Sequence, residues 1–118
     1  METKTVTNHP YDILLCANKA GKAKAYKELE RCEMCESLGL PITSMDEEIY
    51  NALVKRSMNN GKSEKAAKYI ASCLMTPTVG KSKFVDAVRE LFQRALDIEA
   101  RGENSILVRE SIRTALSY

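Results

Sequence analysis

The chain has 118 residues, of which 44% are hydrophobic and 29% are charged, so its size and composition are those of one ordinary globular domain. The formal net charge of +2 is too small to indicate a nucleic-acid or membrane-surface partner by itself. No apolar run is long enough to cross a membrane, and no apolar signal-peptide stretch opens the chain. We therefore expect a cytoplasmic protein with one domain over residues 1–118, in which residues 1–9 form a flexible N-terminal arm.

The first forty residues have the least regular pattern. Residues 11–20 and 22–38 form either two helices bent at Gly21 or one continuous helix, because a glycine costs only about 1 kcal/mol inside a helix. We favour a bend at Gly21. In the second stretch, Ala25, Leu29 and Cys32 recur at helical spacing and predict the buried face.

Two helices are predicted in the middle of the chain. Ser44 and Glu47 are spaced as a capping box, which predicts a helix from that point to about Met58. The turn residues Asn59, Asn60 and Gly61 end it, and Ser63 caps a shorter helix that stops before Thr76 and Pro77.

The strongest helical pattern covers residues 83–101. Its apolar residues step by four, three, four and three positions, Ser82 is placed to cap its first turn, and Gly102 is placed to end it. A last helix follows, capped by Asn104 or Ser105 and reaching the end of the chain. Strand-like alternation is missing throughout, so we expect an all-α fold: a compact bundle of five or six antiparallel helices built from helical hairpins.

The stripe on residues 83–101 carries more apolar surface than one neighbouring helix needs to cover. A subunit or partner contact is a natural use for the excess. The sequence therefore predicts a small, non-enzymatic interaction protein, a regulator or adaptor that binds a partner protein and forms a homo-oligomer. The predicted interface comprises Phe84, Val88, Leu91, Phe92 and Ala95.

Two groups of lysines support an alternative function. They surround Gly21 and Gly61, and inter-helix turns at both glycines would present positive charge to the phosphates of a nucleic acid. Aromatic residues that could stack on bases are few, although Tyr26 and Tyr69 lie near the lysines. A helix-turn-helix formed by residues 45–58 and 63–75 fits less well. The predicted phosphate contacts are Lys22, Lys24, Lys27, Lys62, Lys65 and Lys68.

A faint internal similarity relates the two lysine-bearing segments. At an offset near 40, Tyr11 aligns with Tyr50 and Gly21 with Gly61. Residues 50–54, with Gly61 and Ala66, resemble a pentatricopeptide unit, which is a helical-hairpin repeat, and this resemblance implies binding of single-stranded RNA. The second hairpin departs from the family pattern because it lacks the usual tail before its proline, and residues 83–118 show no third copy.

Signatures of catalysis or of a bound cofactor are weak. Cys32 and Cys35 have the spacing of a zinc-binding or redox pair, but no second pair accompanies them, so we interpret them as small buried residues. Residues 80–82 (GKS) resemble the end of a phosphate-binding loop without its first glycine. His9 is the only histidine and has no recognisable catalytic partner. We expect no metal, no cofactor and no enzymatic activity.

Overall fold

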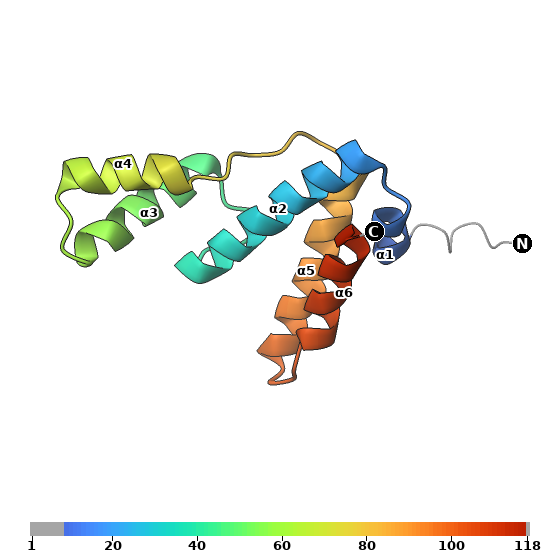
Figure 1. Ribbon diagram of the computed structural model, residues 1–118. Helices are drawn as coiled ribbons and strands as arrows, with labels where there is room; N and C mark the ends of the chain where they lie inside the picture. The colour runs from blue at the N-terminus through green and yellow to red at the C-terminus, as the bar shows by residue number, and fades with distance from the viewer. Residues whose placement is uncertain (1–8, 118) are drawn as a thin grey trace, which may run out of the picture. The chain divides into compact units, whose positions relative to one another are not determined.

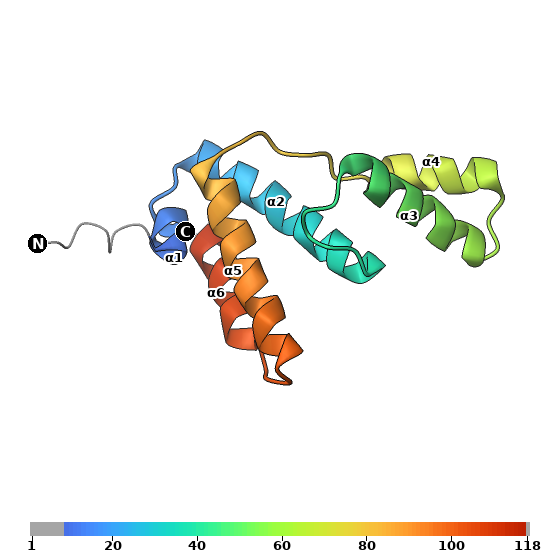
Figure 2. The same cartoon turned by 180° about the vertical axis from the view of Figure 1, so that it is seen from behind.

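The computed structural model describes residues 9–117, and these form six helices without a strand. The helices are α1 (Pro10–Leu15), α2 (Lys19–Leu38), α3 (Asp46–Asn59), α4 (Glu64–Leu74), α5 (Lys83–Ala100) and α6 (Ile106–Ser117). Helices α3 and α4 form one antiparallel hairpin, and α5 and α6 form another, as Figures 1 and 2 show from opposite sides. The predicted all-α bundle class, with five or six helices built from hairpins, is confirmed.

The described chain divides into two compact units. Unit 1 comprises the residues up to Leu29 and those from Val79 onward, whereas unit 2 is Glu30–Thr78. The division falls inside α2, so this helix gives its first half to unit 1 and its second half to unit 2. In unit 1, α1 packs against both α5 and α6; in unit 2, α3 packs against α4.

The ends of α4, α5 and α6 follow the predicted capping residues. The Ser63 hydroxyl accepts the Ala66 amide at 3.2 Å, and the Ser82 hydroxyl accepts the Phe84 amide at 3.1 Å. Gly102 has a φ of +80°, the left-handed conformation that ends α5. Asn104 caps α6, while the Ser105 hydroxyl donates to Glu99 and lowers the pKa of that carboxyl, with help from Arg109.

The capping box at the start of α3 lies one residue later than the sequence predicts. Met45 is the N-cap, and the Glu48 carboxylate, rather than that of Glu47, accepts the Met45 amide at 2.9 Å. The Ser44 hydroxyl instead donates to the carbonyl of Pro41 at 2.6 Å. This bond holds the Ser44 hydroxyl against the preceding turn, and the helix begins with Met45 as its N-cap.

The bend predicted at Gly21 is wrong. The chain turns at residues 16–18, where Asn18 accepts the Gly21 amide at 2.8 Å and starts α2, and Gly21 lies inside that helix. Gly21 is buried because the ring of Phe84 on α5 lies against it; a Cβ there would come within 2.5 Å of the ring. The glycine therefore serves helix packing and not a turn.

Gly21→Ala is expected to destabilise the protein by about 1 kcal/mol. Overpacking against Phe84 costs about 1–3 kcal/mol, and the better helix propensity of alanine returns about 1 kcal/mol. In a Phe84→Leu background the same change is expected to become neutral or stabilising. Urea unfolding with and without Gly21→Ala, in the unsubstituted protein and in the Phe84→Leu background, measures this reversal of sign. Gly80→Ala, with open space around it, is the control; equal effects at Gly21 in both backgrounds would contradict the packing argument.

Two charged side chains of α2 are buried. Glu28 has no exposed surface and accepts a hydrogen bond from the Arg89 Nε at 2.7 Å. Arg31 is 2% exposed and donates to the carbonyls of Ser44 and Thr76, each at 2.8 Å. Arg31 also pairs with Asp46 of α3, so each unit contains an ion pair that starts on α2.

Candidate functional site

The apolar stripe of α5 is covered by the chain itself. Val88 and Ala95 have no exposed surface, Phe92 is 1% exposed and Leu91 is 3% exposed, whereas Phe84 is half-buried. The neighbours of α5 include α1, a helix that the sequence pattern did not place against it. Burial within the chain explains the stripe, so the excess of apolar surface that led us to predict a partner there no longer supports an interface.

The first lysine group lies on a helix face and not at a turn. Lys24 and Lys27 are exposed and Lys22 is half-buried, and all three lie in the first half of α2, in unit 1. Because Gly21 is helical, only Gly61 supplies an inter-helix turn of the expected kind; its φ is +94°. The aligned glycines thus occupy different structural positions, and the internal similarity does not describe two equivalent hairpins.

The second lysine group forms the basic tip of unit 2, where α3 ends and α4 begins. All of its members are exposed, and within residues 55–68 the only carboxylate is Glu64, which pairs with Lys68 at 3.0 Å. The sequence places all five of its cations around Gly61, but the predicted phosphate contacts included only three of them and omitted Lys55 and Arg56. The basic tip comprises Lys55, Arg56, Lys62, Lys65 and Lys68.

Charge is separated along the hairpin. The acidic residues of α3 are in its first turn, and Lys55 follows Glu48 by seven residues, or about 10 Å along the helix. A hollow of about 280 Å³ adjoins the tip, lined by Lys55 and Arg56 together with the polar side chains of Ser37, Asn59 and Asn60. Tyr69, on the same face of α4 as Lys65, is 72% exposed. The tip therefore offers positive charge, amide groups and an aromatic ring.

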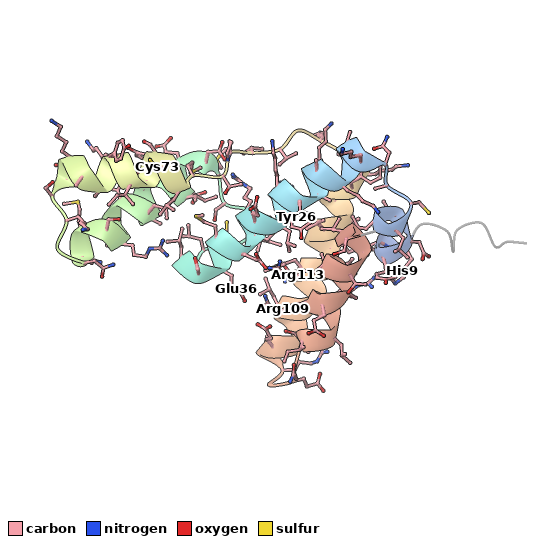
Figure 3. All side chains as sticks on the ribbon, viewed as in Figure 1. His9, Tyr26, Glu36, Cys73, Arg109 and Arg113 are labelled. Carbon is pink, nitrogen blue, oxygen red and sulfur yellow. The ribbon has the colours of Figure 1, made fainter. Side chains whose placement is uncertain are left out.

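Unit 1 contains a larger cavity, of about 500 Å³, between α1, α5 and α6. Figure 3 shows His9 at the start of α1, and its side chain is one of those that line the cavity. Sequence reasoning missed this cavity because its residues come from three helices, each with an ordinary pattern; only the lone histidine was a signal. The lining residues are His9, Tyr11, Asp12, Leu91, Arg94, Val108 and Ser111.

The remaining motifs have structural roles. Cys32 and Cys35 are fully buried in α2, and no group of three or more potential metal ligands occurs within residues 9–117. Ser82 caps α5, and a segment with neither helix nor strand precedes Gly80, so the strand required before a phosphate-binding loop is missing there. None of the helices described has the length and apolar character needed to cross a membrane.

Comparison with known proteins identifies no relative of this chain. No family model, no curated protein and no solved structure matches it. The resemblance to a pentatricopeptide unit therefore rests only on the residues of the α3–α4 hairpin.

Proposed function

We propose that this protein acts by binding single-stranded nucleic acid through the basic tip of unit 2. The observation that carries this function is the concentration of five exposed cations, with one carboxylate among them, around the turn that joins α3 to α4. Phosphate contacts from lysine and arginine supply most of the affinity of such complexes, and they require exposed cations and not a deep pocket.

The side chains beside the tip favour a single strand over a duplex. Tyr69 is 72% exposed and can stack on an unpaired base, while Asn59 and Asn60 offer donors and acceptors to base edges. The resemblance of this hairpin to an RNA-binding repeat points to the same class of ligand. The predicted contacts Lys62, Lys65 and Lys68 remain in the proposal, and Lys55 and Arg56 join them.

The tip is tested by the salt dependence of binding to a fluorescein-labelled oligouridine 12-mer, measured by fluorescence anisotropy. Four phosphate contacts on a single strand give a slope of log K against log salt of about −3, so the affinity should fall about 50-fold between 50 and 200 mM KCl. Lys62→Glu/Lys65→Glu should weaken binding at least tenfold at 50 mM and reduce the slope by about 1.4.

A matched variant separates local contacts from net charge. Lys81→Glu/Lys83→Glu replaces two exposed lysines of unit 1 and changes the net charge by the same amount as Lys62→Glu/Lys65→Glu. Its affinity for the oligouridine should stay within threefold of that of the unsubstituted protein. Both variants place glutamate near a helix N-terminus, where it is tolerated, so neither should unfold the protein. Equal losses in the two variants, or the absence of salt-sensitive binding, would reject the proposed function.

Binding to a partner protein, with homo-oligomer formation, is the second candidate. The specific observation is at the start of α6, where Leu107 is 82% exposed and Ile106 is 54% exposed. Light scattering at low and high salt distinguishes the two candidates, because an apolar interface persists when salt rises whereas phosphate contacts weaken. A salt-resistant oligomer that Leu107→Asp converts to a monomer would favour this candidate.

A further inference from the structure

The cavity of unit 1 combines an apolar wall with polar groups from the surrounding helices. Leu91 of α5 and Val108 of α6 provide the apolar part, and His9 and Arg94 stand together at another part of the lining. Its volume of about 500 Å³ lies within the range of small-molecule sites, which pair mostly apolar walls with a few placed polar groups.

The hydrogen bonds of His9 fix which of its nitrogens carries the proton. The Nδ1 atom accepts the backbone amide of Tyr11 at 3.1 Å, so the neutral ring is protonated at Nε2. That Nε2 lies 3.4 Å from a terminal nitrogen of Arg94, which is also a donor. Two donors this close together are both satisfied when one acceptor, above all an anionic oxygen, lies beside them within hydrogen-bond distance of each.

We propose that this cavity binds a small monocarboxylate with a linear apolar chain. The carboxylate accepts from the His9 Nε2 and from the Arg94 guanidinium, and the chain lies against Leu91 and Val108. Two carboxylates limit the charge of the ligand: Glu90 already pairs with Arg94 at 3.0 Å, and Asp12 lines the cavity. A single negative charge is therefore favoured over a dianion such as a phosphate monoester.

The apolar wall should determine how affinity varies with the length of the chain. Each methylene removed from water strengthens binding about fourfold until the cavity is filled. Acetate should therefore bind much more weakly than octanoate. A site governed by the two donors alone would instead treat all monocarboxylates alike.

The proposal is tested with octanoate, octanol and octylamine as probes of the full chain, by isothermal titration and by NMR. Octanoate should bind at least tenfold more tightly than octanol or octylamine and should shift the resonances of His9 and Val108. Equal affinity for octanoate and octanol would show an apolar hollow without anion recognition and would overturn the proposal.

The variant Arg94→Gln tests the cationic part directly. The Arg94 side chain is 48% exposed, so the fold should tolerate the change, and circular dichroism verifies this. The affinity for octanoate should fall at least tenfold, whereas the affinity for octanol should stay the same. Arg101→Gln removes another exposed, carboxylate-paired arginine outside the cavity and should leave both affinities unchanged. Unchanged octanoate binding in Arg94→Gln would overturn the proposal. All cavity residues belong to unit 1, so this result is independent of nucleic-acid binding by the basic tip.

Discussion

Arg31→Ala is expected to lower the free energy of unfolding by about 3 kcal/mol or more. The side chain is 3% exposed, and its guanidinium connects the carbonyl that precedes α3, the carboxylate of Asp46 at the first position of α3, and the carbonyl of Thr76 just after α4. Its loss leaves the buried carbonyl of Ser44 without its donor and takes from the Asp46 carboxylate its cationic partner, which is among the costlier changes a domain can undergo.

The Asp46 carboxylate also depends on this arrangement. The Thr78 hydroxyl donates to it at 2.7 Å and, with the Thr78 amide and Arg31, lowers the pKa of Asp46 below its usual 3.8. A depressed pKa in the folded state means stability that is present above about pH 3.8 and lost as the pH falls toward the lowered value. Arg31→Ala should therefore weaken stability at neutral pH and make acid unfolding less steep in that range.

Two controls separate the hydrogen bonds of the Arg31 guanidinium from the effect of its charge and from the effect of helix propensity. Arg31→Lys keeps the positive charge but lacks the planar guanidinium that donates to two carbonyls at once. It should therefore restore only part of the free energy of unfolding that Arg31→Ala removes. Arg56→Ala, at an exposed position of the same unit, should change stability by less than about 0.5 kcal/mol. Urea unfolding followed by circular dichroism measures all three, and an Arg31→Ala midpoint equal to that of Arg56→Ala would refute the argument.

The helices that the sequence predicted well are those whose ends are encoded by local chemistry. The capping serines before α4 and α5 and the left-handed Gly102 act within a few residues, so their positions could be predicted without knowledge of the rest of the chain. The stripe of α5 was also correctly predicted to be an apolar face. Its cover was not predictable, because α1, which packs on α5, lies about seventy residues earlier in the chain.

The errors occurred where a distant residue determines what a local signal means. Gly21 carries the same local signal as a turn glycine, and only the Phe84 ring explains why it is helical. The basic tip was partly visible, because its cations are close in sequence. The cavity of unit 1 was not visible, because its donors His9 and Arg94 are 85 residues apart.

The buried Glu28 was detectable in principle. It follows Ala25 by three residues and precedes Cys32 by four, so it lies in phase with the apolar face of α2, and a charge at that position indicates a buried ionic contact. What the sequence could not show is the other side chain, Arg89, which lies 61 residues later on α5.

The two halves of this pair are expected to have unequal costs when removed. Arg89→Met should destabilise the protein by about 3 kcal/mol, because it takes a cation away from a carboxylate that has no exposed surface. Glu28→Met should cost less, because the Arg89 side chain is 37% exposed and its charge can be hydrated. The double variant should be at least as stable as Glu28→Met, since an apolar pair removes both desolvation costs.

A double-mutant cycle in urea, at constant pH and salt, measures this asymmetry and the coupling between the two side chains. We expect a coupling of about 3 kcal/mol or more, because a double variant that is no less stable than Glu28→Met cancels the whole cost of Arg89→Met. Arg94→Met, on the same helix but paired with Glu90 at the surface, provides the matched control and should change stability by less than about 1 kcal/mol. Equal single-variant costs and a coupling near zero would mean that burial of Glu28 is compensated without Arg89, and that α2 and α5 are held in unit 1 by apolar packing alone.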